Sequence, residues 1–360
     1  MSAQEAQSAS SPVRRVILVM LLAVALYGGF VLYRGTASIA KSLEHYAAWT
    51  FAAACGLAFA NYLLRFLKWE YYLSVLGIRG VPKGESLLIF LSGFVLTITP
   101  GKVGEVFKSV ILSQLRGVPI QRTAPIVVAE RVTDLIGVIT LIAIGSASFP
   151  GGVIWASIGA ALVVALLVFV ASPRLSEAFV VFLPKLPSAL GRVGGRIAPK
   201  IGEALGQLRT LTTPARLVWP TILSIAAWGL EGMALWVILK GFSGPEAGAP
   251  SLTLTAFFYA TATLAGALIP VPGGLGVTDG LLQEQMSRLG GVDPGIATAA
   301  MLLVRFATLW FAVAVGFAAL GILRASRPGL AAGGPVATVA EATETTELDE
   351  PIPPASANTP

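Results

Sequence analysis

Two short segments of this 360-residue chain break apolar runs: Ile98-Thr-Pro-Gly-Lys-Val-Gly-Glu105 and Val271-Pro-Gly-Gly-Leu-Gly-Val-Thr-Asp279. The first segment ends the apolar run Leu87–Thr99, and the second follows an apolar run that ends at Ile269. Proline lacks a backbone donor and glycine permits turns that other residues avoid, so each segment is predicted to interrupt a helix. A half-helix of mixed polarity is predicted after each break, over Lys102–Leu115 and Val277–Met286.

The composition is that of a membrane protein. Hydrophobic residues make up 55% of the chain and charged residues 12%, whereas soluble domains carry about 25% charged residues. This excludes an ordinary soluble enzyme, a disordered chain and a nucleic-acid binder, because the basic residues behind the net charge of +6 lie between apolar runs. A single cysteine, Cys55, and a single histidine, His45, leave no disulfide, zinc cluster or Ser-His-Asp triad. No metal or cofactor is predicted.

We predict an all-α, polytopic helical membrane protein with about six full spans and two re-entrant helical hairpins. The full spans are expected at about 16–33, 47–67, 123–147, 152–171, 217–240 and 296–322. Broken backbone persists in hydrocarbon only where it is buried in protein or lines a wet cavity, so the two hairpins should point at a shared site. With this topology, 16 of the 25 lysines and arginines lie in cytoplasmic loops and four in outer loops. The charge bias supports this topology with both termini in the cytoplasm, and we expect the protein in the cell inner (cytoplasmic) membrane.

Three segments make up the predicted domain organisation. Residues 1–14 are expected to be a disordered cytoplasmic N-terminus, and residues 326–360 a disordered C-terminal tail. Residues 15–325 form the integral membrane domain, which includes a basic cytoplasmic loop over 173–216. That loop reads either as a basic helix on the inner leaflet or as an irregular loop.

The breaks belong to an internal repeat. Each is followed by a span that carries one arginine: Arg131 lies 31 residues beyond Pro100, and Arg305 lies 33 residues beyond Pro272. Because one hairpin is predicted to enter from each side, the repeat is inverted, as in many transporters.

The predicted site is an anion-binding cavity near the middle of the membrane. Charges inside a span are costly and need a function or a partner. Lys102, Arg131 and Arg305 are predicted to bind a phosphate head group, together with the backbone of Gly101, Gly273 and Gly274. Glu105, Glu130, Asp134 and Asp279 are predicted supporting carboxylates. The alternative is a set of structural ion pairs that lock the hairpins against their neighbours.

Other polar and aromatic residues receive structural interpretations. Arg65, Lys68 and Trp69 are expected to anchor the inner end of the second span, with binding of a lipid head group there as the lesser alternative. Four tryptophans are interpreted as packing or interfacial residues, namely Trp219, Trp228, Trp236 and Trp310. Glu231 lies inside a span and should have a partner.

At this point the sequence resembles a known family. The segments Pro100-Gly-Lys-Val-Gly-Glu105, Glu130-Arg-Val-Thr-Asp134 and Pro272-Gly-Gly-Leu-Gly-Val277 resemble three signature segments of the lysylphosphatidylglycerol synthase transmembrane-region family, also called flippase-like integral membrane proteins. The resemblance covers about residues 15–325 and implies movement of a lipid between leaflets. Asp279 stands where many members carry glutamate. Only a short tail follows residue 325, so the synthase activity of fused relatives is not expected here.

Three functions follow from these observations. The first is a flippase that moves an anionic phospholipid or a polyprenyl-phosphate-linked lipid. Its expected partners are membrane lipids, and no nucleic-acid partner is expected. The second is an intramembrane enzyme acting on a lipid head group, with Glu105, Glu130 or Asp134 as general base. The third is a secondary transporter of a small water-soluble anion.

Overall fold

The computed structural model describes residues 42–97, 105–146, 206, 208, 210–242, 250–269 and 271–327, with ten single positions between 153 and 172. The predicted N-terminal segment and first span therefore lie outside the described residues, as do residues 328–360 of the C-terminal tail and most of the basic loop and of the span at 152–171.

All elements in these ranges are helical, which confirms the all-α class. They are α4 (Ala48–Val75), α5 (Lys83–Ser92), η1 (Gly93–Leu96), α6 (Phe107–Arg116), α7 (Ile120–Ser146), α11 (Pro214–Lys240), α12 (Leu252–Leu268), η5 (Pro272–Gly274), α13 (Val277–Arg288), α14 (Pro294–Arg305), η6 (Phe306–Trp310) and α15 (Phe311–Ser326). Three segments among them are long and apolar enough to cross a membrane: Ala48–Val75, Pro214–Lys240 and Pro294–Ser326. The predicted count of six spans and the inverted repeat remain predictions.

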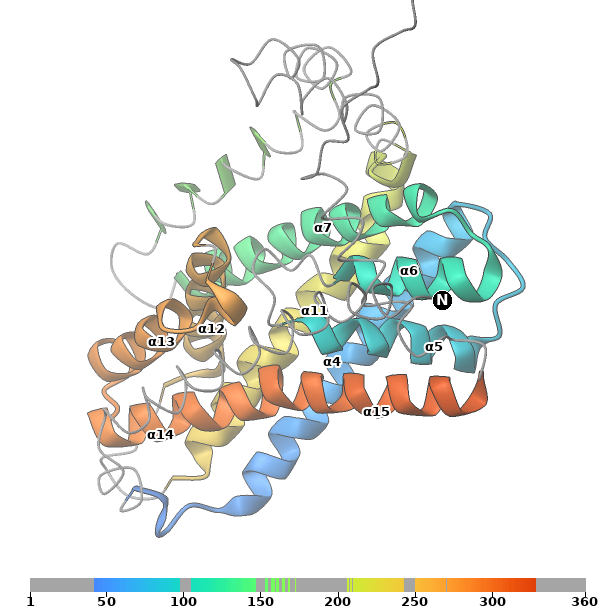
Figure 1. Cartoon of the computed structure of the whole chain (residues 1–360). Coiled ribbons are helices and arrows are strands. Elements are labelled where there is room, and N and C mark those ends of the chain that lie inside the picture. The colour runs from blue at the N-terminus through green and yellow to red at the C-terminus, as the bar shows by residue number, and fades with distance from the viewer. Residues whose placement is uncertain are drawn as a thin grey trace, which may run out of the picture.

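The last of these spans is one continuous element. It consists of α14, a single π-helical turn (η6) and α15, which follow one another along the lower side of the molecule (Figure 1). A π-helical turn inside an α-helix is uncommon and frequently occurs at functional sites. Here it directly follows Arg305, which ends α14.

The second helix break lies where the sequence predicts it. Helix α12 ends at Leu268, and α13 begins at Val277. Between them Gly273, Gly274 and Gly276 adopt φ angles of 61°, 67° and 82°. These left-handed conformations cost glycine little and strain other residues, so the glycines account for the sharp turn. At the first break, η1 ends at Leu96 and α6 begins at Phe107, with 98–104 outside the described residues.

Several helix ends meet at one pole of the bundle, which we call the first pole. Glu85, in the first turn of α5, accepts hydrogen bonds from Arg116 at the end of α6 (2.7 Å) and Arg327 after α15 (2.6 Å). Arg122 in the first turn of α7 donates to the Leu76 carbonyl after α4 (2.5 Å). Both ends of the α5–α6 pair therefore lie at the first pole.

Other helix ends meet at the opposite, second pole. The Ala47 amide before α4 donates to the Gly241 carbonyl after α11 (2.9 Å). Gly145 near the end of α7 packs against Phe257 near the start of α12, and Gly290 after α13 packs against Phe258. Both ends of the α12–α13 pair therefore lie at the second pole, and the two broken pairs occupy opposite ends of the molecule (Figure 1).

The apolar core is divided between the two broken pairs. One cluster joins α11, α12, α13 and α14 and contains Phe258, Leu282 and Ala300. The other joins α4, α5, α6 and α15 and contains Trp69, Ile89 and Leu320.

Candidate functional site

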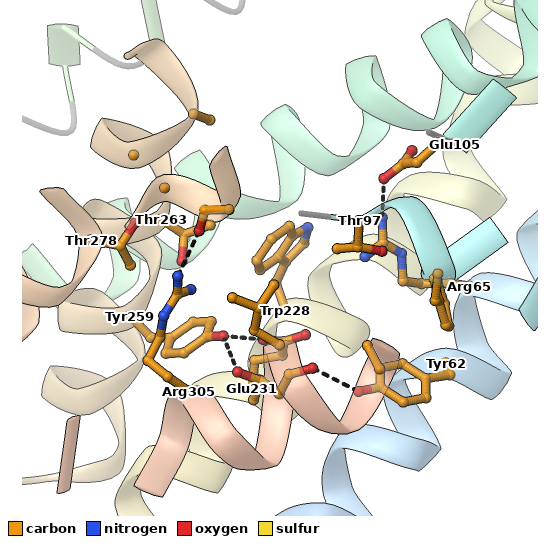
Figure 2. A pocket seen from close by; sticks show the side chains of 18 residues that line it. Tyr62, Arg65, Thr97, Glu105, Trp228, Glu231, Tyr259, Thr263, Thr278 and Arg305 are labelled. Carbon is orange, nitrogen blue, oxygen red and sulfur yellow. Dashed lines mark hydrogen bonds and ion pairs between the residues drawn. The ribbon is translucent and has the colours of Figure 1, made fainter. Parts of the chain in front are cut away.

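A cavity of about 110 Å³ lies between the two helix breaks (Figure 2). Its lining comes from α4, η1, the first break, α11, α12, the second break, α13, α14, the π-helical turn and α15. The residues are Tyr62, Arg65, Phe94, Thr97, Glu105, Trp228, Glu231, Tyr259, Thr263, Gly266, Ala267, Gly273, Gly274, Thr278, Arg305, Thr308, Leu309 and Ala312. Figure 2 shows Arg65 and Glu105 at one end, Arg305 and Tyr259 at the other, and Trp228 and Glu231 between them.

Arg305 occupies the end of the cavity formed by the second break. Its Nε lies 2.8 Å from Asp279 Oδ1, and its Nη2 donates to the Gly273 carbonyl at 2.6 Å. Asp279 Oδ2 in turn accepts a hydrogen bond from the Gly276 amide at the start of α13 (2.9 Å). The predicted residues Gly273, Gly274 and Arg305 therefore do meet, and Asp279 fixes the arginine to the glycine turn.

Arg65 occupies the end formed by the first break. Its Nη2 lies 3.1 Å from Asp134 Oδ2 and 3.9 Å from Glu105 Oε1, and its guanidinium carbon lies 5.9 Å from the centre of the Trp228 ring. Trp228 was interpreted as a packing or interfacial residue; it is 92% buried and also lines the cavity.

The anchoring interpretation of Arg65 and Lys68 is wrong. Only 1% of the Lys68 side chain is exposed, and its ammonium lies 2.6 Å from Asp134 and donates to Ser224 (2.8 Å). The reason is that α4 continues to Val75, two turns beyond the predicted end of the span. Both cations therefore belong to the interior of the helix sequence and not to its end, and their side chains face the bundle. Lys68, one of the 16 charges that the sequence assigns to cytoplasmic loops, therefore lies inside the bundle instead.

Arg65 and Lys68 belong to an ion-pair cluster. Its members are Arg65, Lys68, Glu105, Lys108, Glu130, Arg131 and Asp134. Arg131 lies 2.9 Å from Glu105 and 3.0 Å from Asp134, and Lys108 lies 2.5 Å from Glu130. The four cations exceed the three carboxylates by one, so the cluster carries a formal charge of +1 when all members are ionised.

The predicted cations are not all placed on the cavity. Arg131 is 30% exposed and bound by two carboxylates, and it is not among the residues that line the cavity. Lys102 and Gly101 lie outside the described residues. The binding of a head group by Lys102 and Arg131 therefore stays a prediction, as does the alternative that the ion pairs are structural.

Glu231 has the partners that its position requires. Its carboxylate accepts hydrogen bonds from the Asn61 amide and the Tyr259 hydroxyl. Tyr259 also contacts the Thr308 hydroxyl (3.1 Å), and Tyr62 donates to the Thr308 carbonyl in the π-helical turn (2.8 Å). This network connects α4, α11, α12 and η6 in the wall of the cavity.

Sequence reasoning missed a polar stripe on α4. Asn61, Arg65 and Lys68 stand at i, i+4 and i+7, which places them on one helix face. That spacing inside an apolar span was the available signal. In the described ranges, no three His, Cys, Asp or Glu side chains are placed to hold a metal ion.

Comparison with known proteins identifies the family of the chain. Residues 17–316 match the family described as "Lysylphosphatidylglycerol synthase TM region". A similar curated protein is the "UPF0104 membrane protein" of Methanothermobacter thermautotrophicus, which is 34% identical over 104 residues. That match spans 29% of this chain and 29% of the relative. The family match covers most of the chain, and the chain is therefore an integral membrane protein of the lysylphosphatidylglycerol synthase TM-region family.

Proposed function

We propose that the protein is a lipid translocase, which moves an anionic phospholipid or a polyprenyl-phosphate-linked lipid between the leaflets of the membrane. The observation that carries the proposal is the cavity between the two helix breaks, which presents Arg65 and Arg305 inside an apolar helical bundle. A cavity that carries charged side chains within an apolar bundle suits a head group, while the acyl or prenyl chains stay in the bilayer.

The chemistry of the lining favours a phosphate group. Guanidinium groups bind phosphate oxygens through paired hydrogen bonds, and the glycine turn allows a ligand to approach the backbone closely. In the structure Arg65 and Arg305 are each held by carboxylates, Asp134 and Asp279. These carboxylates keep the arginines positioned when no phosphate is bound, and a phosphate oxygen competes for the same N–H donors.

The proposed transport route uses two opposed hairpins. In this proposal the protein has six full spans and an inverted repeat, with both termini in the cytoplasm of a cell whose inner membrane it spans. The positions of the two broken pairs at opposite poles support this arrangement, and so does the set of basic side chains near the first pole, Arg79, Arg116, Arg122 and Arg327. Alternating closure of the two hairpins over the cavity would expose the head group to one face at a time.

The test is lipid exchange in proteoliposomes. Vesicles containing fluorescent phosphatidylglycerol are treated with an impermeant quencher, and the rate at which inner-leaflet lipid becomes accessible is measured. Wild-type protein should accelerate exchange, and Arg65→Ala and Arg305→Ala should each slow it about tenfold or more, because a charged hydrogen bond contributes about 1.5–3 kcal/mol. The matched control is Arg288→Ala, which removes an exposed arginine paired with Glu284 on α13.

The outcomes separate the candidate functions. Wild-type exchange no faster than in empty vesicles, or full exchange by both cavity variants, would contradict translocation. Uptake of a soluble anion regardless of lipid composition would instead indicate the secondary transporter. Conversion of a lipid to product by protein in detergent, where no leaflets exist, would indicate the intramembrane enzyme.

A further inference from the structure

One oxygen of Glu130 is buried without a hydrogen-bond partner. Glu130 Oε2 accepts from the Lys108 ammonium at 2.5 Å, whereas Oε1 is enclosed and has no partner. Only 4% of the side chain is exposed. A buried carboxylate oxygen that accepts no hydrogen bond carries its desolvation cost uncompensated, so a proton or a water molecule at Oε1 would relieve that cost.

A small second cavity lies against this side chain. Its volume is about 10 Å³, and Glu130, Lys108, Glu105 and Arg65 are among its lining residues. That volume is about the size needed for one water molecule. Arg65, Phe94 and Glu105 line both this cavity and the larger one, so Glu130 is separated from the proposed head-group site by a single layer of side chains.

Among the residues that the structure describes, the charged and titratable groups around Glu130 come from three elements. They are Arg65, Lys68 and Tyr72 on α4, Glu105 and Lys108 at the start of α6, and Arg131 and Asp134 on α7. The residue contributed by α5 to the small cavity wall, Phe90, is neutral. Negative charge added to this cluster by a bound phosphate therefore acts on Glu130 across a short distance in a low-dielectric interior.

Among the three carboxylates of the cluster, Glu130 contacts the fewest cations. Asp134 contacts three cations, Arg65, Lys68 and Arg131, and Glu105 contacts two arginines. Glu130 contacts one cation, Lys108. That ammonium also lies 4.7 Å from the centre of the Trp69 ring and 5.2 Å from that of Phe90, and these aromatic faces stabilise it when the carboxylate loses its charge.

We infer that Glu130 takes up one proton when an anionic phosphate head group binds at Arg65, so that lipid movement is coupled to proton movement. The inference rests on the proposed function, because it assigns the coupling ion of the same site. A hydronium ion from the solvent transfers its proton to a lone pair of Oε1: an O–H bond of the hydronium breaks and leaves water, an O–H bond forms at Oε1, and nothing is oxidised or reduced. By linkage, the bound anion and the bound proton each increase the affinity for the other.

The first test measures protons directly. Purified protein in detergent and weak buffer is titrated with short-chain phosphatidylglycerol, and both binding and pH change are recorded. Wild-type protein should take up about one proton per lipid bound. Glu130→Gln, which keeps the size of the side chain, should take up none per lipid bound, while Glu284→Gln, an exposed carboxylate on α13, should behave as wild type.

The second test locates the proton by infrared spectroscopy. A band of a protonated carboxyl group should appear when wild-type protein binds the lipid and be lost in Glu130→Gln. Lys108→Gln removes the cation that holds Glu130 ionised, so in that variant the band should be present before lipid is added. This second variant keeps the proposal testable if Glu130→Gln does not fold.

The outcomes distinguish this inference from the proposed function. Lipid binding by wild-type protein without proton uptake overturns the coupling and leaves translocation standing. Absence of lipid binding overturns both. Equal proton uptake with inorganic phosphate alone would support the proton site while indicating a soluble anion, and not a lipid, as the ligand.

Discussion

At the residue scale, Asp134 joins three cations to a single carboxylate. Its two oxygens lie 2.6 Å from Lys68, 3.1 Å from Arg65 and 3.0 Å from Arg131, and one of them accepts from Ser224 at 3.0 Å. These contacts join α4, α7 and α11. Because a buried charge needs a partner of opposite sign, this one carboxylate allows three cations to remain inside the bundle.

We therefore predict that Asp134→Ala strongly destabilises the protein. The change leaves Lys68 buried with its closest counter-charge removed and weakens the hold on both arginines. Loss of one partner of a buried ion pair costs about 3–5 kcal/mol, which should appear as a large fall in the thermal unfolding midpoint in detergent. Glu284→Ala, which breaks an exposed pair with Arg288, should change stability by about 0.5 kcal/mol or less. Equal midpoints for the two variants would contradict the role of Asp134.

At the element scale, close helix packing depends on glycines that leave no room for a side chain. A methyl group on Gly232 of α11 would lie 2.6 Å from Ala256 Cα of α12, and one on Gly137 of α7 would lie 3.0 Å from the Ser224 backbone of α11. Small residues allow the backbones of membrane helices to approach and gain contact energy. Gly229, one turn before Gly232 on the same helix, has open space where its side chain would be.

This contrast gives a prediction with a built-in control. Gly232→Ala should destabilise the protein, because the cost of overpacking, about 1–3 kcal/mol, exceeds the gain of about 1 kcal/mol in helix propensity. Gly229→Ala receives the same gain without the clash and should be neutral or slightly stabilising. The measurement is the thermal midpoint of each purified variant. A Gly232→Ala midpoint at or above that of Gly229→Ala would show that α11 and α12 are not in close contact.

A second feature at the scale of elements is the pair of hydrogen bonds through which Glu85 of α5 joins Arg116 of α6 and Arg327 after α15 at the first pole. Glu85 lies in the first turn of α5, before the apolar run of the hairpin. Its partial burial raises the pKa of the carboxyl, but the hydrogen bonds from Arg116 and Arg327 outweigh this, and the pKa lies below its ordinary value of 4.5. Glu85 therefore stabilises the folded state while it is ionised.

The sign of the pH dependence follows from this lowered pKa. The stabilisation is fully present above the unfolded-state value near 4.5 and is lost as the pH falls through the lower folded-state pKa. Glu85→Gln should lower the thermal midpoint at neutral pH, and its difference from wild type should shrink below about pH 4. Glu284→Gln serves as the comparison. A difference that stays constant down to strongly acidic pH would contradict the ionised contact.

At the scale of the whole molecule, two broken helix pairs face each other from opposite poles, and the cavity lies between them (Figures 1 and 2). Each pair packs in its own apolar cluster. If the poles correspond to the two membrane surfaces, the residues at one pole share a single aqueous compartment. This arrangement predicts which side of the membrane each helix end contacts.

Cysteine labelling in a Cys55→Ser background tests this arrangement. Arg79→Cys and Gln114→Cys lie near the first pole and should react with an impermeant thiol reagent from the same side of the membrane. Glu44→Cys and Arg288→Cys lie near the second pole and should react from the opposite side. All four native side chains are exposed in the structure. Labelling of Gln114→Cys from the side that labels Arg288→Cys would mean that the first pair crosses the membrane and is not a hairpin.

The predictions from sequence were accurate where the physical signal is local. Proline and glycine break helices wherever they occur, so the second break, Gly273 and Gly274 could be placed in advance. The pairing of Arg305 with Asp279 was not specified, although both were identified as site residues. Arg65 and Lys68 were misinterpreted because apolar content fades gradually at the end of a span, and the true end of α4 at Val75 depends on the helices that cover its last turns.

Apolar composition and the two glycine- and proline-rich segments alone establish a helical membrane protein with two interrupted helix pairs. These features can be recognised in the sequence because the preference of a side chain for lipid and the backbone geometry of proline and glycine are properties of single residues. The partners of the buried charges depend on the folded bundle: Arg65 meets Asp134 across 69 residues, and Asn61 meets Glu231 across 170. No short-range pattern encodes such pairs, since they form only when α4, α7 and α11 pack and exclude water from the groups between them.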